Sequence, residues 1–403
     1  MRTIPRRFLN RTSHPTLGTL ILLSGLSALA MNIFLPSLPG MALYFDADYS
    51  LMQLSVALYL AMSAVVQIFI GPVSDKFGRR PVILWSMILF LLATLGCLYA
   101  PTAEVFLFCR LCQAIVAATM VLSRAAVRDI CEGPEAASMI AYVTMGMAVV
   151  PMISPVIGGV LEEAVGWQAN FWLLIALGAL TYLIAFYDLG ETAQKSGKTL
   201  IGQFREYPKL LRSPRFWGYS LASGLSSGAF FAYLGGAPFV GTQIYGLGPA
   251  ELGLYFSSPA VGYFVGNFIS GRFSVRVGVN QMVLRGTIIN TSGVSLSLAL
   301  ALAGMDSVYS FFGFMTLVGI GNGMAIPNAT AGAISVRPHL AGTASGLAGA
   351  IMIGVGAGLS AFAGYLLVPG STATPLLQIM TATAVLGGVS ILVVIRRERR
   401  LNL

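Results

Sequence analysis

Long apolar stretches follow one another along nearly the whole chain, with only short polar segments between them. A helix needs roughly 20 apolar residues to cross the hydrocarbon core of a bilayer. The strands of a membrane β-barrel alternate apolar and polar residues, whereas these stretches are continuously apolar. The pattern therefore predicts an all-α membrane protein.

The charge content supports this prediction. Charged residues make up 10% and hydrophobic residues 56% of the 403 residues, whereas a soluble domain carries about 25% charged residues. So few charges cannot cover a surface in water. This excludes a cytosolic enzyme, a nucleic-acid-binding protein and a secreted disulfide scaffold. One span with a short loop takes about 33 residues, so the chain accommodates about twelve spans.

We place six spans on each side of the one long polar segment. The first six cover residues 16–38, 50–71, 81–100, 103–126, 137–161 and 167–188. The second six cover residues 217–241, 250–271, 281–304, 307–331, 341–367 and 373–395. The predicted units are thus an N-terminal half (1–189), a central cytoplasmic loop (190–216) and a C-terminal half (217–403). The first stretch is too long for the apolar core of a signal peptide, so we interpret it as a retained helix.

Basic residues fall on one side of this topology. They are Arg2, Arg6, Arg7, Arg11, Lys76, Arg79, Arg80, Arg128, those of the central loop, Arg272, Arg276, Arg337 and Arg396–Arg400. The opposite loops carry acidic residues and neither Lys nor Arg: Asp46, Asp48, Glu104, Glu162, Glu163, Glu251 and Asp306. The positive-inside rule therefore places both termini in the cytoplasm. Basic residues in cytoplasmic loops also account for the net charge of +9, so this charge does not indicate binding to nucleic acid.

A short repeat relates the two halves. The segment Gly71–Gly78 (GPVSDKFG) follows the second span, and Gly271–Gly278 (GRFSVRVG) follows the eighth, 200 residues later. Internal repeats are common in secondary transporters, whose substrate site lies near the bilayer midplane between the repeats. The sequence therefore predicts a transporter with its site between the halves.

The first of these segments, extended to Pro81, resembles the loop between helices two and three of the major facilitator superfamily. The resemblance implies that family's fold, twelve transmembrane helices in two pseudo-symmetric six-helix halves. It also implies that the acidic residue, Asp75, docks a helix of the opposite half in one state, and that Arg79 pairs with Asp129. The residues given a conformational role are Gly71, Asp75, Gly78, Arg79, Arg80 and Asp129.

Two further patterns lie inside spans. Arg110 is seven residues from the expected periplasmic end of span four, about 10 Å deep. Charges at that depth are usually functional, although snorkelling to water is the alternative. The segment Arg110–Gln113 resembles the superfamily's R-x-x-Q-G motif, with Ala114 in place of glycine. We predict that Arg110 and Gln113 orient the substrate.

The segment Ser154–Gly159 (SPVIGG) in span five is similar to the end of the superfamily's antiporter motif. Small residues let helices approach closely, and proline bends a helix. We therefore predict a conformational role for Pro155, Gly158 and Gly159. A generic packing face of small residues is the alternative.

The segment Met31–Pro39 (MNIFLPSLP) resembles the end of helix one in the Bcr/CflA group of drug:proton antiporters. This implies efflux of small amphipathic compounds, such as amphenicols or bicyclic antibiotics, across a bacterial inner membrane. The group usually has a proton-linked Asp where this chain has Asn32, which cannot titrate. Proton coupling thus lacks its usual carrier, and Asp129 is the remaining candidate. A static ion pair at the cytoplasmic edge is the alternative for Asp129.

Aromatic residues at the depth of Asn32 complete the predicted binding site: Tyr59, Phe231, Tyr233 and Tyr255. Aromatic rings supply apolar contact to small ligands, although packing or lipid contact is the alternative for each of them. We expect no cofactor and no metal. The expected partners are a small-molecule substrate, protons and the lipid bilayer, and the expected state is a monomer. The alternative functions are a specific metabolite exporter or importer with weak or no proton coupling, and a non-transporting membrane receptor.

Overall fold

The computed structural model describes residues 8–11, 13–131, 133–193, 207–337, 341–368 and 370–400. The regular elements in these ranges are all helices. Within the same ranges, nine helical segments are long and apolar enough to cross a bilayer. Arg2, Arg6 and Arg7, and the predicted loop residues 194–206, lie outside the described residues.

The first half contains six membrane segments, two of which are interrupted. Its elements are α1 (Leu17–Asn32), η1 (Leu35–Ser37), α2 (Leu38–Tyr44), α3 (Tyr49–Phe77), α4 (Arg79–Leu98), α5 (Ala103–Gln113), η2 (Ala114–Val116), α6 (Ala117–Ile130), α7 (Gly133–Val165) and α8 (Gln168–Asp188). The first segment breaks between α1 and α2, where Pro36 and Pro39 lack the N–H that an α-helix needs.

The second half follows the same plan. Its elements are α10 (Tyr207–Leu211), α11 (Pro214–Phe239), η3 (Val240–Ile244), α12 (Pro249–Phe256), α13 (Ser258–Val277), α14 (Val279–Leu302), α15 (Val308–Ser335), α16 (Ala341–Leu366) and α17 (Thr374–Arg400). Apart from the short helix α10, these helices form six membrane segments, so the predicted twelve spans are confirmed. Helix α10 occupies part of the central stretch that we predicted as a loop.

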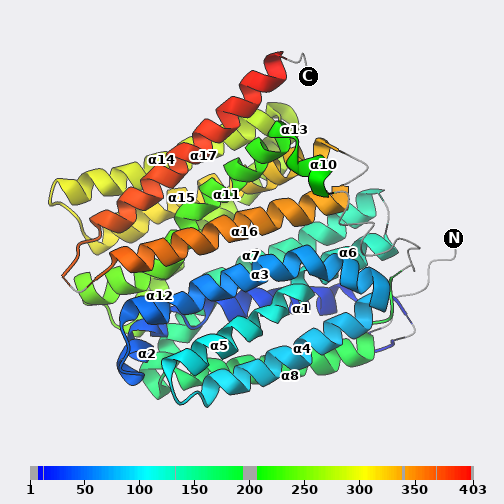
Figure 1. Ribbon diagram of the computed structural model, residues 1–403, viewed down its shortest axis with the longest axis horizontal. Helices are drawn as coiled ribbons and strands as arrows, with labels where there is room; N and C mark the ends of the chain where they lie inside the picture. The colour runs from blue at the N-terminus through cyan, green and yellow to red at the C-terminus, as the bar shows by residue number, and fades with distance from the viewer. Residues whose placement is uncertain are drawn as a thin grey trace.

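The two groups of helices meet along two main contacts. In Figure 1, helices α1 to α5 occupy the lower part of the view and α14 to α17 the upper part. Helix α3 packs beside α16 where the groups meet, and α7 packs against α12. The two helices of each pair lie far apart in the sequence, so the interface depends on long-range contacts. We keep residues 190–216 as the predicted boundary between the halves.

The sequence repeat forms the same turn twice. Gly78 has φ 98° and ψ 150°, and Gly278 has φ 86° and ψ 149°. Each glycine donates its N–H to the carbonyl of a serine, Ser74 or Ser274, at 2.9 Å. This backbone conformation is open to glycine and strained for other residues. The glycine at position 71 lies within α3, not in a turn as we predicted, because the helix continues to Phe77.

A carboxylate at the end of each half's last helix binds the first helix of that half. Asp188 of α8 accepts hydrogen bonds from the Thr16 backbone N–H at 2.9 Å and the Thr19 hydroxyl at 2.7 Å. Glu398 of α17 accepts from Arg215 Nε and from the Tyr219 hydroxyl of α11, both at 3.0 Å. Each half is therefore closed on itself at the same end of the molecule.

Candidate functional site

A cavity of about 850 Å³ lies between the two halves. Its wall is built from α1, α3, the start of α4, α6, α7, α10, α11, α13, α15 and α16. It extends from the middle of the molecule to the end that carries the loops around Arg79, Arg128 and Arg276, which we call the basic end. Small-molecule sites typically measure about 300–1,000 Å³, so the cavity can hold a drug-sized compound.

Three of the predicted binding residues line this cavity: Asn32, Tyr59 and Phe231. The Asn32 side-chain amide donates to the Ala28 carbonyl at 2.7 Å, which fixes its orientation. No hydrogen bond to its carboxamide oxygen is found among the described residues. That oxygen can therefore accept a hydrogen bond from a ligand.

Arg110 lies behind the cavity wall in this conformation, so its predicted role in orienting the substrate stays a prediction. The side chain is fully buried, and its guanidinium lies between two aromatic rings, with Cζ 4.0 Å from the centre of the Phe34 ring and 4.3 Å from that of Tyr59. It donates to the Ala30 carbonyl at 2.9 Å and to the side-chain oxygen of Gln113. Stacking and hydrogen bonding hold the charge inside the N-terminal half.

Gln113 also lies outside the cavity wall, as part of the same buried network. It is fully buried and donates to the Thr94 hydroxyl at 2.8 Å. The network reaches the cavity indirectly, because Arg110 stacks on Tyr59 and Tyr59 lines the wall. Arg110 and Gln113 are thus placed to position Tyr59, whereas neither lines the cavity in this conformation.

Tyr233 and Tyr255 likewise lie away from the cavity, in an aromatic cluster of the second half. The Tyr233 ring is 4.9 Å from that of Phe256, and the Tyr255 ring is 5.6 Å from that of Phe312. Two residues along an α-helix correspond to about 200° of rotation, so Phe231 and Tyr233 point to nearly opposite sides of α11. Tyr233 and Tyr255 thus pack against other aromatic side chains, which was the alternative interpretation for them.

A charge cluster lies where the cavity meets the basic end. Arg79 Nη1 is 2.6 Å from Asp75 Oδ1, and Arg79 Nε is 3.1 Å from Asp129 Oδ2. The Thr192 hydroxyl also donates to Asp129, at 3.2 Å. The structure therefore brings together the pair that the superfamily resemblance implied, and one arginine holds both carboxylates.

Glu191 completes this region, and sequence reasoning missed it. Its carboxylate accepts the backbone N–H groups of Arg79 at 2.8 Å and Arg80 at 3.3 Å, which begin α4. A carboxylate at a helix N-terminus accepts hydrogen bonds from the backbone N–H groups that have no partner within the helix. Its negative charge also interacts favourably with the helix dipole. Arg80 itself donates to the carbonyls of Leu189 at 2.8 Å and Phe186 at 3.0 Å. Glu191 is more than 100 residues from the start of α4, so no local sequence pattern reveals the contact.

Tyr207 of helix α10 forms part of the wall on the side of the central segment. Its hydroxyl donates to the Ile68 carbonyl of α3 at 3.1 Å. Burial raises the pKa of the Tyr207 hydroxyl above its ordinary value, so this group is neutral at pH 7. The short helix, not expected from the sequence, thereby attaches the central segment to the first half.

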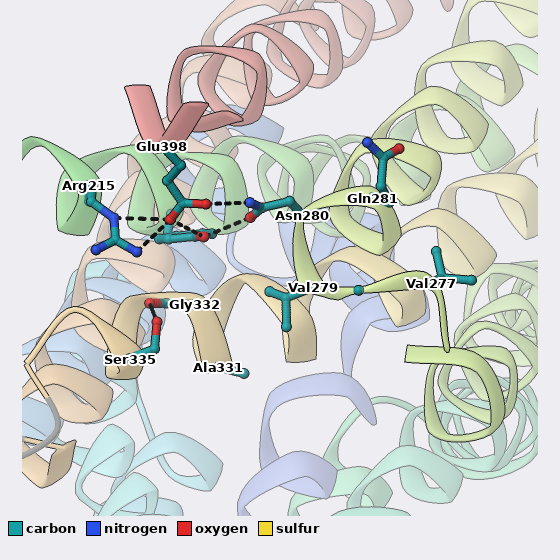
Figure 2. Close-up of a pocket in the computed structure, with 11 residues that line it drawn as sticks. Arg215, Val277, Val279, Asn280, Gln281, Ala331, Gly332, Ser335 and Glu398 are labelled. Carbon is teal, nitrogen blue, oxygen red and sulfur yellow. Dashed lines mark hydrogen bonds and ion pairs between the residues drawn. The ribbon is translucent and has the colours of Figure 1, made fainter. Parts of the chain in front are cut away.

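Among the described residues of the second half, no counterpart of the charge cluster around Arg79 is found. By the 200-residue repeat, Arg79 corresponds to Val279, and the matching 28-residue segments Ala103–Ile130 and Val308–Ser335 align Asp129 with Ile334. Both charges are thus replaced together by apolar residues. A cavity of about 340 Å³ lies here, and Figure 2 shows Glu398 between Arg215 and Asn280 on its wall. Beside this smaller cavity the second half has the Arg215–Glu398 ion pair instead.

Glycines close the opposite end of the cavity between α7 and α12. Gly159 lies against the Pro249 carbonyl, and Gly253 lies against the Pro155 carbonyl, so closely that a Cβ at either glycine would overlap backbone atoms. The neighbouring Gly158 lies in the same way against the Ile33 carbonyl at the end of α1. In the predicted small-residue motif, Gly159 therefore forms a contact between the halves. Gly158 forms a contact within the first half.

Two polar contacts of α3 close the same end. The buried Gln53 side chain donates to the backbone carbonyl of Ser360 on α16 and, at 3.1 Å, to its hydroxyl. The Tyr49 hydroxyl donates to the Gly235 carbonyl of α11 at 2.9 Å. Both bonds join the two halves. The cavity is therefore sealed at the end opposite the basic end.

The described fold, a bundle of twelve helical segments with a cavity between two halves, agrees with a family comparison. The sequence matches the Major Facilitator Superfamily over residues 20–361, with a second match over residues 242–401. The chain belongs to the major facilitator superfamily. Members of this superfamily are transporters, not enzymes, and the chain is accordingly a multi-pass membrane transporter.

Two curated relatives cover nearly all of this transporter. A chloramphenicol resistance protein of Pseudomonas aeruginosa is 31% identical over 382 residues, which are 92% of this chain and 89% of that protein. A bicyclomycin resistance protein homolog of Haemophilus influenzae is 28% identical over 373 residues, 91% and 93% of the two chains. These names agree with the Bcr/CflA resemblance of the first helix.

Solved structures share the fold of this superfamily member. The peptide transporter POT, solved in complex with sulfate, has a TM-score of 0.78 with 11% identity and covers 99% of this chain and 97% of its own. At that identity the likeness concerns the fold alone.

Proposed function

We propose that this protein is a secondary active exporter of small amphipathic compounds, of the phenicol or bicyclic antibiotic type, across a bacterial inner membrane. The observation that carries the proposal is the cavity of about 850 Å³, which reaches the basic end and is sealed at the other. The positive-inside rule makes the basic end cytoplasmic, so the cavity faces the compartment from which an exporter takes its substrate. Both termini are then cytoplasmic, and the protein works as a monomer.

Export requires that the sealed end opens while the basic end closes. Opening separates α7 from α12 at Gly159 and breaks the bond between Gln53 and Ser360, since both contacts join the halves. Closure at the basic end brings the second half toward the cluster around Arg79. Asp75, held by Arg79 in the present conformation, is the residue we expect to exchange partners in that step.

Coupling to protons is part of the proposal, in a form weaker than usual for the family. The carboxylates on the wall of the described cavity are Asp75 and Asp129, and both bind Arg79 at the basic end. Asn32 occupies the deeper position and cannot titrate. This observation favours a second candidate function, a metabolite transporter with weak or no proton coupling, and a pH gradient distinguishes the two.

The test is chloramphenicol accumulation in cells that lack their own exporters and express this chain. We expect lower accumulation and several-fold higher resistance than in cells with an empty vector. Gly159→Val should abolish the effect, because the added side chain overlaps the Pro249 backbone when the far end closes. Gly313→Val is the matched control, since a Cβ at this exposed glycine meets no atom within 4 Å. Equal accumulation with the native chain and the empty vector would overturn the proposed substrate class.

A further inference from the structure

Arg124 of α6 places a positive charge on the cavity wall. It is half-buried, and it forms no ion pair with a carboxylate of the described residues. Arg128, four residues later, lines the cavity on the same face of α6. At 1.5 Å per residue it lies about 6 Å nearer the basic end. Two like charges at this spacing disfavour each other, so packing stability alone does not account for the pair.

The remaining charges on the wall compensate only part of the charge of this pair. The wall carries two carboxylates, Asp75 and Asp129, and both are held by Arg79. Those three residues carry a net charge of −1, so with Arg124 and Arg128 the wall keeps a net charge of +1. A cavity with low-dielectric walls concentrates ions of the opposite sign.

Neutral polar and aromatic side chains line the cavity along with Arg124. Tyr263 of α13, on the opposite half, lies near Arg124 and lines the same cavity. Amide and hydroxyl groups on the wall, such as those of Asn322 and Thr330, offer hydrogen bonds, and Phe230 and Phe231 offer apolar contact. These groups match a compound with an apolar body and one charged group.

We propose that the preferred substrates of this transporter are amphipathic organic carboxylates, whose carboxylate binds Arg124 while the apolar body contacts the aromatic residues of α11. The proposal rests on the proposed transport function and specifies its substrate class. Arginine suits the role because its planar guanidinium can donate two parallel hydrogen bonds to one carboxylate. Arg128 acts as the first contact for an anion that enters from the basic end. Organic cations are disfavoured because they meet an uncompensated positive charge.

The experiment compares three probes on the purified protein: chloramphenicol, which is neutral, chloramphenicol hemisuccinate, which adds a carboxylate to the same body, and the cation tetraphenylphosphonium. Binding is followed by intrinsic tryptophan fluorescence. We expect the native protein to bind the hemisuccinate at least tenfold more tightly than chloramphenicol, and the cation most weakly. Arg124→Gln should lower the ratio of the hemisuccinate to the chloramphenicol affinity about tenfold. Arg124→Lys should restore only part of it.

The matched control is Arg272→Gln, which removes an exposed arginine of α13 that does not line the cavity. It should leave the affinity ratio unchanged. Should Arg124→Gln fail to fold, a salt titration of the native protein provides the second measurement. Raising NaCl from 50 to 500 mM should weaken hemisuccinate binding several-fold more than chloramphenicol binding, because salt screens charge–charge attraction.

A native protein with no preference for the hemisuccinate, or an affinity ratio that Arg124→Gln leaves intact, overturns the substrate class. Export of chloramphenicol by cells that express the native chain measures the proposed function separately. If that export persists while the anion preference is absent, the inference fails and the transport function stands. If neither probe is exported, the transport function itself fails.

Discussion

Gln53 of α3 donates its side-chain amide to the backbone carbonyl of Ser360 on α16, and this bond joins the two halves at the sealed end of the cavity. Its side chain is fully buried between α16 and Gly235 of α11. A hydrogen bond of this kind contributes about 0.5–1.5 kcal/mol net. The bond is therefore strong enough to bias two conformations that are close in free energy.

We predict that Gln53→Leu shifts the population toward the conformation open at that end, by roughly two- to tenfold. The measurement is the distance between spin labels at the exposed positions Leu43 and Tyr309, in a chain whose native cysteines have been replaced. The fraction of molecules with a longer distance between the two labels should increase. Gln281→Leu, on the wall of the smaller cavity in the second half, is the control. An unchanged distance distribution in Gln53→Leu would show that this bond does not hold the end closed.

We predict that Asp75→Ala leaves the protein in the membrane and lowers transport at least tenfold. Asp75 binds Arg79 at 2.6 Å, and Arg79 keeps Asp129 when Asp75 is removed, so folding should survive. Transport per molecule in proteoliposomes is the measurement. Lys76→Ala, at the exposed neighbouring residue, should transport normally. Normal transport by Asp75→Ala would exclude a conformational role for this carboxylate.

We predict that Arg110→Ala destabilises the N-terminal half and abolishes transport, and that Arg110→Lys restores little. The guanidinium stacks between Phe34 and Tyr59, and an ammonium reproduces neither its flat faces nor its fork of donors. Desolvated cation–π contacts contribute about 2 kcal/mol each, so the loss should be visible as a lower melting temperature in detergent. A lysine variant with native stability and transport would contradict the stacking role.

We predict that Asn32→Asp strengthens the dependence of transport on a pH gradient. Asn32 lines the cavity deep in the molecule, where a carboxylate can take up and release a proton as the site changes sides, whereas the amide cannot. Substrate-induced proton release is measured in proteoliposomes for the native chain, for Asn32→Asp and for Asp129→Asn. Strong release by the native chain that disappears in Asp129→Asn would assign the proton to Asp129 instead.

The features that the sequence could predict are those that depend on local patterns. Apolar length located the spans, because a bilayer demands a nearly fixed number of apolar residues. The glycine turn at Gly78 was predictable, since its backbone conformation restricts the residue type. Helical spacing alone predicts that Phe231 and Tyr233 point to nearly opposite sides of α11.

Other features depend on contacts between distant segments. That Arg110 lies behind Tyr59 depends on how α5 packs against α1 and α3, which no single stretch encodes. The cap formed by Glu191 joins the central segment to the start of α4 in the first half. The position of Arg124 on the cavity wall could not be predicted, because it depends on how the two halves are packed together.

The carboxylates of Asp188 and Glu398 bear on whether this protein needs a single continuous polypeptide. Each binds the start of the first helix in its own half, so neither contact depends on the peptide bonds of residues 190–206. A gene split within that stretch would encode two fragments that each keep this contact. Such a pair could assemble side by side in the membrane, in the way two subunits of a heterodimer do.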